Sequence, residues 1–336
     1  MKKWIRIIVT IGITVILFFV LQELMMPKYM NTSKEGALIG EYYDSMMNHD
    51  VIFVGDCEVY ENFSPVTLWN YYGINSYIRG SASQTIWQSY YILKDTFERE
   101  QPKVVVFNVL SMQYEQPVSE AYNRMNIDGM KMSKNKIDAA KASMTEEEDL
   151  ITYLFPLLRF HSRWQELSEE DWTYLFRRDR ISYNGYLMQT GVQAATVIPE
   201  EKPLSDYGFS EKCYDYLDKI RELCEKNNAE LLLIKAPSLY PCWYEQWDEQ
   251  IADYAEEHEI GYYNLLEEIE QIGIDYETDT YDGGMHLNVS GAEKLSVYFG
   301  QILRETYGVE NRRGEQELDD YFAELTKQYE QEKEES

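Results

Sequence analysis

Residues 51–57 read Val-Ile-Phe-Val-Gly-Asp-Cys, an apolar run that ends in a tight turn at a cysteine. Such a short apolar run, bounded by turn residues, is typical of a strand buried inside a parallel sheet. A turn after this kind of strand lies at the carboxyl edge of the sheet, where the next helix begins. We therefore expect Cys57 at that edge, beside a helix N-terminus that favours negative charge.

A second informative segment, residues 282–290, reads Asp-Gly-Gly-Met-His-Leu-Asn-Val-Ser. Acyl transfer by a side-chain nucleophile needs an imidazole as base and a carboxylate that orients the imidazole. Cys57, His286 and Asp282 supply these three groups. Ser290 and Glu293 have the spacing of a capping box, which predicts a helix that begins just after the histidine and fixes its loop.

Outward from these segments, short apolar runs alternate with helical stretches. This alternation predicts an α/β fold, a mostly parallel sheet with helices on both faces. We expect strands at residues 51–54, 76–78, 104–108, 230–235 and 261–264, and helices at 65–72, 84–100, 211–226, 244–257 and 292–305. The alternation is lost from about residue 112 to 206, which predicts a mostly helical insertion that forms a lid or one wall of a cleft.

The first 27 residues predict an N-terminal transmembrane helix. Lys2, Lys3 and Arg6 precede the uncharged run Ile7–Leu21, and Trp4 extends it toward the roughly 20 residues that a bilayer requires. Bulky polar residues follow in place of a small-residue cleavage site, which favours a signal anchor over a signal peptide, with a buried core helix as the alternative. The positive-inside rule then predicts a single-pass protein with a cytoplasmic N-terminus and an extracytoplasmic main domain.

Composition limits the classes of partner. The 336 residues are 44% apolar and 27% charged, as expected of a globular domain, here about residues 28–310. The formal charge of -28 argues against nucleic acid and anionic lipid surfaces, which bind clustered Lys and Arg. Part of this charge lies in residues 311–336, which we interpret as an acidic, solvated C-terminal helix or tail.

Several short motifs follow one another in a recognisable order. They are the turn Gly55-Asp56-Cys57, Gly80 after the second strand, Asn108 at the end of the third, and Asp282 with His286 before the last helix. Their order resembles that of the SGNH/GDSL hydrolase superfamily, over about residues 50–110 and 208–305. The nearer likeness is to its membrane-anchored branch in bacterial envelope and polysaccharide gene clusters, the DltD-like and acyltransferase-associated proteins, which implies a bacterial cell membrane.

This resemblance implies an ester hydrolase or acyltransferase on a flavodoxin-like, three-layer fold. Cys57 takes the place of the family's nucleophilic serine, and His286 matches its base. The backbone N–H of Cys57, the N–H of Gly80 and the amide of Asn108 match the family's oxyanion hole. Donors of this kind stabilise the tetrahedral intermediate by on the order of 3 kcal/mol each in related chemistry.

The chain departs from the family pattern at two points. The first is cysteine in place of serine. The second is the spacing of the carboxylate, because Asp282 lies four residues before His286, whereas the family has three. The paired glycines 283 and 284 tolerate unusual backbone angles and could absorb the extra residue. The alternatives are that Asp279 supports the histidine or that no carboxylate does.

Cys57 itself allows three interpretations. A helix N-terminus lowers the pKa of a thiol and favours a catalytic nucleophile, but Asp56, Glu58 and Glu61 oppose this effect with negative charge. The chain has four cysteines, and a disulfide between Cys57 and Cys242 is the second interpretation. An inert or purely binding cysteine is the third.

Aromatic residues suggest where a substrate cleft lies. His161, beside Arg163, is either a packed imidazole or part of that cleft, and Trp243 follows the fourth strand, where it could line the cleft. Aromatic faces stack on sugar rings, but they also fill ordinary cores. No close cluster of His, Cys and Asp has the spacing of metal ligands, so we expect no metal, and no cofactor is expected either.

Two main hypotheses follow. The first is an extracytoplasmic, membrane-anchored acyl hydrolase or O-acyltransferase that acts on a cell-surface glycan or another acylated envelope polymer. The second is a catalytically inactive protein of the same fold that binds glycan or a membrane-bound acyltransferase. A cysteine peptidase shares these residue types but has no local signature in the sequence.

Overall fold

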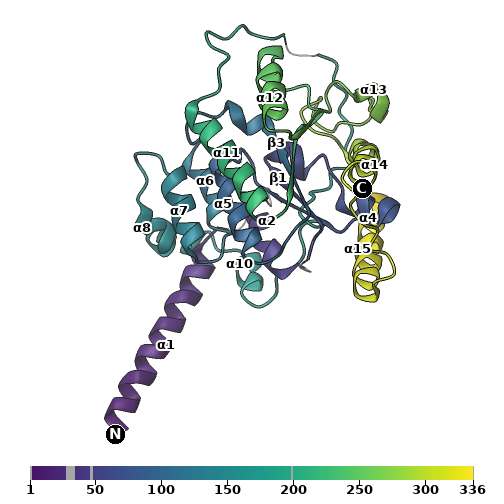
Figure 1. Ribbon diagram of the computed structural model, residues 1–336. Coiled ribbons are helices and arrows are strands. Elements are labelled where there is room, and N and C mark those ends of the chain that lie inside the picture. The colour runs from purple at the N-terminus through teal and green to yellow at the C-terminus, as the bar shows by residue number, and fades with distance from the viewer. Residues whose placement is uncertain (1, 28–34, 46–47, 198–199, 336) are drawn as a thin grey trace.

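A five-stranded, all-parallel sheet forms the centre of the computed structural model (Figure 1). The structure describes residues 2–27, 35–45, 48–197 and 200–335. The strands lie in the order β2-β1-β3-β4-β5, which is the order of flavodoxin-like sheets. Their bounds are β1 Val51–Gly55, β2 Ser76–Gly80, β3 Val104–Asn108, β4 Glu230–Lys235 and β5 Gly261–Asn264. The predicted α/β class and the predicted parallel sheet are confirmed.

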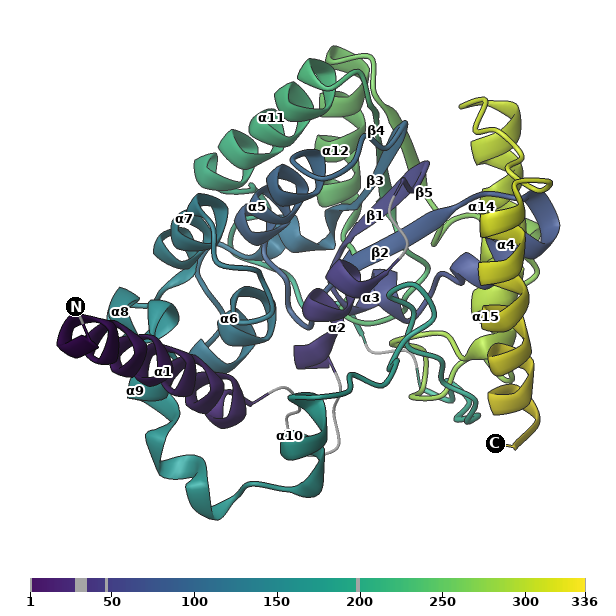
Figure 2. The ribbon, with the colours of Figure 1, turned by 90° about the horizontal axis from the view of Figure 1, so that it is seen from below.

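Helices cover both faces of the sheet and make two separate cores (Figure 2). Along β1, Val51 and Phe53 enter one core while Ile52 and Val54 enter the other, so every strand residue is buried and the run is apolar throughout. The first core contains α4 (Pro65–Tyr72), α14 (Val289–Glu305) and α15 (Gln316–Glu335). The second contains α5 (Ile86–Phe97), α11 (Glu211–Lys226) and α12 (Glu245–Glu257).

His286 lies shortly before the helix α14. This helix begins earlier in the chain than the sequence analysis predicted. α14 starts at Val289, and its N-cap is Asn288, whose side-chain oxygen accepts hydrogen bonds from the backbone N–H of Ser290 and Gly291. The expected capping box at Ser290 is therefore not the cap. Asparagine is as good an N-cap as serine, and its side chain also donates to the carbonyl of Thr278, so the loop is tied on both sides.

The insertion after β3 is helical for only part of its length. Its elements are η2 Val109–Gln113, α6 Glu120–Ile127, α7 Lys134–Ser143, α8 Leu150–Leu154, α9 Leu157–Phe160, η3 His161–Gln165 and α10 Glu169–Tyr174. No helix or strand follows among the described residues from 175 to 210. There Asn184 accepts from the N–H of Ile78 and donates to the carbonyl of Ser76, which covers the open edge of β2.

The two ends of the chain form helices of opposite character. α1 (Lys2–Met25) is long and apolar enough to cross a membrane, and its central window is not buried against the rest of the chain. α15, in contrast, buries Leu318, Phe322, Leu325 and Tyr329. The ring of Phe322 stacks on Trp69 of α4 with centroids 4.2 Å apart. The acidic C-terminal segment is thus a helix as expected, but it is packed on the domain and is not a solvated tail.

The N-terminal part of the domain and the connections complete the fold. α2 (Glu35–Glu41) and η1 (Tyr42–Asp44) precede β1, and the one-turn helix α3 (Cys57–Tyr60) follows it. α13 (Ile269–Ile272) follows β5. In a sheet of this order, ligands bind outside the carboxyl ends of the strands where the order reverses, between β1 and β3. Cys57 and Asn108 both lie there.

Candidate catalytic site

Cys57 is the first residue of α3, directly after the turn that ends β1. Asp56 is the N-cap of this helix, and its carboxylate accepts from the backbone N–H of Glu58 at 3.2 Å. Gly55 is needed for the tight turn, since a Cβ at this position would lie 2.5 Å from a methyl group of Val59. Cys57 is partly buried, and as the first residue of α3 it lies at the carboxyl edge of the sheet.

His286 is paired with Asp282 and not with Asp279. The imidazole Nδ1 lies 2.7 Å from Asp282 Oδ2, and the backbone N–H of His286 donates to Asp282 Oδ1 at 2.9 Å. The extra residue of this loop is accommodated by Gly283 and Gly284, which have φ angles of +82° and +100°. Asp279 forms an ion pair with Lys294 instead, at 2.6 Å.

A second carboxylate, Glu61, also faces His286. Its Oε2 lies 3.1 Å from Nδ1 and accepts a hydrogen bond from the Tyr281 hydroxyl at 2.7 Å. The sequence analysis considered Glu61 only as a source of negative charge near Cys57. Its position four residues after Cys57, one helical turn away, is the signal that could have linked it to the site.

The loop of His286 is also joined by a hydrogen bond to Asn62, just after the end of α3. The N–H of Leu287 donates to the side-chain oxygen of Asn62 at 2.8 Å. Asn62 follows Glu61, whose own N–H donates to the carbonyl of Cys57. The structure therefore brings the cysteine turn and the histidine loop, which are 229 positions apart in the chain (residues 57 and 286), to one place.

The environment of His286 favours its protonated form. Burial lowers the pKa of the imidazole, but the hydrogen bond with Asp282 and the charges of Glu61 and Asp282 outweigh burial and raise the pKa above its usual value. The same contacts outweigh the burial of Asp282 and lower the pKa of its carboxyl. Nε2 of His286 is buried and has no hydrogen-bond partner within the described parts of the chain. The Cys57 thiol therefore does not form a hydrogen bond with this nitrogen in the structure.

The Cys57 thiol, in contrast, is held in its neutral form. Burial raises its pKa well above the ordinary value, and the charges of Asp56, Glu61 and Glu58 raise it further. The helix that was expected to favour a thiolate has only four residues, so it contributes little opposing field. The sequence analysis named two opposing effects on the pKa of this thiol, the helix N-terminus and the nearby carboxylates. The effect of the carboxylates is the larger of the two.

Asn108 does not present its amide to open space. Its Nδ2 donates to Asp56 Oδ1 at 3.2 Å and to Glu58 Oε2 at 3.0 Å, while its Oδ1 accepts from the N–H of Ala236. Gly80, at the end of β2, is opposite Gly55 in the sheet. A Cβ at position 80 would lie 3.0 Å from the carbonyl oxygen of Gly55, so the close approach of the two strand ends requires glycine.

A buried ion pair lies beneath this edge. Lys235, the last residue of β4, has its Nζ 2.9 and 3.0 Å from the two carboxylate oxygens of Glu58, and neither side chain is exposed. Asp56 is also buried, and burial together with the charge of Glu58 raises the pKa of its carboxyl to about 7. Sequence reasoning missed Lys235, although a lysine that ends the apolar run of β4 was the available signal.

The three residues proposed for the substrate cleft lie in other surroundings. Arg163 of η3 donates to the carbonyl of Met25 at the end of α1 and pairs with Asp171, while His161 is exposed. Trp243 is buried against Phe209 and Trp247, and its Nε1 donates to Asp248. None of these described contacts joins the three residues to Cys57 or His286.

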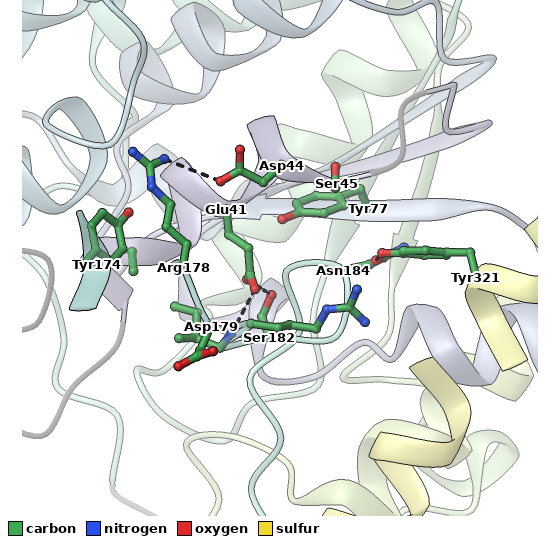
Figure 3. A pocket seen from close by; sticks show the side chains of 13 residues that line it. Glu41, Asp44, Ser45, Tyr77, Tyr174, Arg178, Asp179, Ser182, Asn184 and Tyr321 are labelled. Atoms are coloured by element: carbon green, nitrogen blue, oxygen red, sulfur yellow. Dashed lines mark hydrogen bonds and ion pairs between the residues drawn. The ribbon is translucent and has the colours of Figure 1, made fainter. Parts of the chain in front are cut away.

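A cavity of about 190 Å³, whose lining does not include Cys57, lies elsewhere in the molecule (Figure 3). It is formed by α2, η1 and the segment before Asn184. Glu41 accepts there from the N–H of Ile181 and from the hydroxyl of Ser182, and Arg178 pairs with Asp44. None of the residues that the sequence analysis proposed for catalysis lines this cavity.

The structure also bears on the remaining predictions about the cysteines and metals. All four cysteines lie in the described part of the chain, and none forms a disulfide, so Cys57 and Cys242 are not joined. Within the described residues, no group of three or more His, Cys, Asp and Glu side chains is arranged to hold a metal ion.

Comparisons with known proteins give only a distant likeness. No family model and no curated protein matches the chain. Among solved structures, a Bacteroides fragilis protein described as a "putative acylhydrolase" aligns over 86% of this chain and 95% of its own, with 11% identity and a TM-score of 0.37. A likeness at this level carries no argument about function, which has to come from the site.

Proposed function

We propose that the chain is an acyl hydrolase or O-acyltransferase of the SGNH type, with Cys57 as nucleophile, His286 as base and Asp282 as the group that orients the base. The observation that carries this proposal is the Asp282–His286 pair, whose buried Nε2 has no hydrogen-bond partner among the described residues. An imidazole fixed at Nδ1 with Nε2 available is the arrangement that acyl transfer uses. The loop also contacts Asn62, which lies just after α3, the helix that begins at Cys57.

The reaction takes two acyl-transfer steps. Cys57 Sγ attacks the carbonyl carbon of an ester while His286 Nε2 takes the thiol proton. The tetrahedral intermediate then collapses, the C–O bond breaks and the leaving alcohol takes that proton from His286, which gives a thioester on Cys57. Water or an acceptor hydroxyl next loses its proton to His286 and attacks the thioester carbonyl. The C–S bond then breaks, and the departing sulfur of Cys57 takes the proton back from His286. Because the pKa of the thiol is raised, its proton leaves during the attack and not before it.

The backbone N–H groups of Cys57 and Gly80 are the proposed oxyanion donors. The amide of Asn108 can act as a third donor only when it gives up its hydrogen bonds to Asp56 and Glu58 and donates to the substrate instead. Such an exchange is favoured when one of these carboxyls is neutral, and the pKa of Asp56 is about 7.

We further propose that this chemistry takes place outside the cytoplasm on a cell-surface polysaccharide. The basic residues Lys2, Lys3 and Arg6 at the start of α1 support this orientation. Tyr281 supports the substrate class, because its half-buried ring lies nearly parallel to the His286 imidazole, at 17° with centroids 6.1 Å apart. An aromatic face of this kind beside the base suits a sugar ring.

Two observations favour a second function, a binding protein that has lost catalysis. The Asn108 amide is occupied by carboxylates and the Cys57 thiol is neutral, which together remove two features of an active acyl-cysteine site. Such a protein would bind glycan or a membrane acyltransferase, and its binding would not change in Cys57→Ala.

Intact-mass labelling of the full-length chain in detergent, with p-nitrophenyl acetate, distinguishes the two functions. We expect one acetyl adduct that is lost in Cys57→Ala and slowed at least 100-fold in His286→Ala. Cys242→Ala, at another partly buried cysteine, and His258→Ala, at the end of α12, are matched controls that should label like the wild type. An adduct that persists in Cys57→Ala, or none in any variant, would reject the enzyme and favour the binding protein.

Cys57→Ser tests how the nucleophile is activated. Since a neutral thiol depends on His286 as a general base, a hydroxyl should work in its place, and we expect turnover of p-nitrophenyl acetate within about tenfold of the wild type. A mechanism that starts from a preformed thiolate predicts a loss of several hundredfold. The rate of p-nitrophenol release by both proteins decides between the two.

A further inference from the structure

The part of α1 that is nearer the domain contacts other elements of the chain. The rings of Phe18 and Phe155 contact each other edge to face, with centroids 6.0 Å apart. The Arg163 guanidinium donates to the carbonyl of Met25 at 2.8 Å. α1 also contacts α9, η3 and α10, so residues 150–176 surround the end of α1 that is nearer the domain (Figures 1 and 2). We call residues 150–176 the collar.

The contact between Phe18 and Phe155 fixes the depth of the collar. Glu23 is the first charged residue after the apolar run of α1, so it marks the level at which the hydrocarbon ends. Phe18 lies five residues before Glu23, which at 1.5 Å per residue is about 7.5 Å inside that level. If α1 spans the bilayer, Phe155 must lie at a similar depth. Helices that lie in the interface bury their apolar face by about 5–10 Å.

The exposed side chains of the collar match such a position. Large apolar side chains are unusually exposed there: Ile151 47%, Phe155 38%, Leu158 55%, Trp164 62%, Trp172 52% and Phe176 89%. A soluble surface rarely gathers this many, and tryptophan is enriched where a membrane meets water. Arg178 pairs with Glu23 at 3.6 Å, which places a cation at the level of the headgroups.

We propose that the collar lies in the interface of the same bilayer that α1 crosses, with Phe155, Leu158, Trp164, Trp172 and Phe176 inserted among the lipids. This inference rests on the proposed membrane anchoring by α1. The partner is the bilayer and its hydrocarbon, and not anionic headgroups, because the chain has a formal charge of -28. Held by both α1 and the collar, the domain keeps one orientation and one height above the membrane.

Quenching by brominated lipid tests the inference on the full-length chain. The protein is placed in nanodiscs of phosphatidylcholine with or without bromine on the acyl chains near the headgroup, and tryptophan fluorescence is compared. Emission from Trp164 and Trp172 should be quenched. Trp164→Phe and Trp172→Phe should therefore each lower the fraction of fluorescence that bromine quenches. Trp247→Phe removes a buried tryptophan of α12 and should raise that fraction.

The substitution Trp4→Phe, on α1, distinguishes an error in the proposed membrane anchor from an error in the proposed position of the collar. If Trp4→Phe lowers the quenched fraction while Trp164→Phe and Trp172→Phe do not, α1 spans the membrane and the collar does not lie in the interface. A protein partner that covers the collar would then be the better explanation of its exposed apolar surface. If none of the three substitutions lowers the fraction, the anchor is wrong and this inference is rejected with it. Acyl labelling of Cys57 is measured separately and depends on neither result.

Discussion

Cys57 shows how burial and neighbouring charges together decide the character of one side chain. A thiol at a helix N-terminus usually loses its proton more easily, but here burial, and after it the charges of Asp56, Glu61 and Glu58, raise the pKa of the thiol. The residue can still be a nucleophile if a base removes its proton as it attacks. In the proposed mechanism this base is His286, whose imidazole Nδ1 contacts Asp282 and Glu61.

Asp56→Asn should make Cys57 more reactive. Asparagine keeps the side-chain oxygen that accepts from Glu58 and Asn108, but it removes the nearest negative charge from the thiol. We expect alkylation by iodoacetamide at pH 7.5 to become about tenfold faster, which corresponds to one pKa unit. Peptide mass analysis follows the reaction, with Cys242 in the same sample as the control. An unchanged rate at Cys57 would show that burial alone keeps the thiol neutral.

Asp56 should also make the protein less stable as the pH rises. Its pKa is about 7 in the folded chain and 3.8 ordinarily, so the folded state holds a proton that the unfolded state releases between these values. Stability then falls from about pH 4 to 7, by ~4 kcal/mol at most. Thermal unfolding in detergent at pH 5.5 and 8.0 measures this fall, which should be smaller in Asp56→Asn.

His286 also makes the protein less stable as the pH rises. Asp282 has the opposite effect and makes the protein less stable as the pH falls. The pKa of His286 is raised, so its contribution is complete below its unfolded pKa of about 6.5 and is lost as the pH rises through the folded pKa. The pKa of Asp282 is lowered, so its contribution is present above about pH 4 and is lost as the pH falls through the folded pKa. In His286→Ala, the fall in stability between pH 5.5 and 8.0 should be smaller than in the wild type.

At the scale of elements, the site depends on the ends of strands that meet at one edge of the sheet. β1 supplies the cysteine turn, β3 ends in Asn108 and β4 ends in Lys235, whose ion pair with Glu58 joins β4 to α3. The sequence predicted the strands to within a few residues, because each is a short apolar run between turn residues. It could not predict the ion pair, because nothing in the local pattern shows that positions 58 and 235 meet.

Lys235→Met should destabilise the protein strongly. It leaves the Glu58 carboxylate buried without its cation, at a cost of about 3–5 kcal/mol. Adding Glu58→Gln should recover most of this loss, because the remaining amide carries no charge. Lys103→Met is the control, since Lys103 is about half exposed in its pairs with Asp50 and Glu310, and should cost less than about 1 kcal/mol. Chemical unfolding of the four proteins would contradict this account if Lys235→Met matched the control.

At the scale of the whole molecule, the two terminal helices have different partners. The acidic composition of residues 311–336 suggested a solvated segment, but the apolar residues of α15 recur at helical spacing and pack on α4 and α14. The net charge of this segment gave no indication of its amphipathic pattern, which packs the helix against the first core. α1 instead leaves its apolar surface exposed, as a membrane-spanning helix requires.

Phe322→Ala tests whether α15 is part of the fold. The ring is fully buried and stacks on Trp69, so its removal should lower the free energy of unfolding by about 3–5 kcal/mol. Glu324→Ala, on the exposed side of the same helix, should change it by less than about 0.5 kcal/mol. Equal effects of the two substitutions would mean that α15 is not packed as described.

The sequence by itself determined the parallel sheet, the positions of its strands, the apolar N-terminal helix and the presence of a histidine loop with a carboxylate nearby. These features depend on residues close together in the chain, where periodicity and turn chemistry act. Only the tertiary structure decided that Asp282 and not Asp279 contacts His286, that Glu61 and Lys235 belong to the site, and that His161, Arg163 and Trp243 have other neighbours. Those contacts join residues far apart in sequence, and their energies depend on burial and on summed charge, which exist only once the chain has folded.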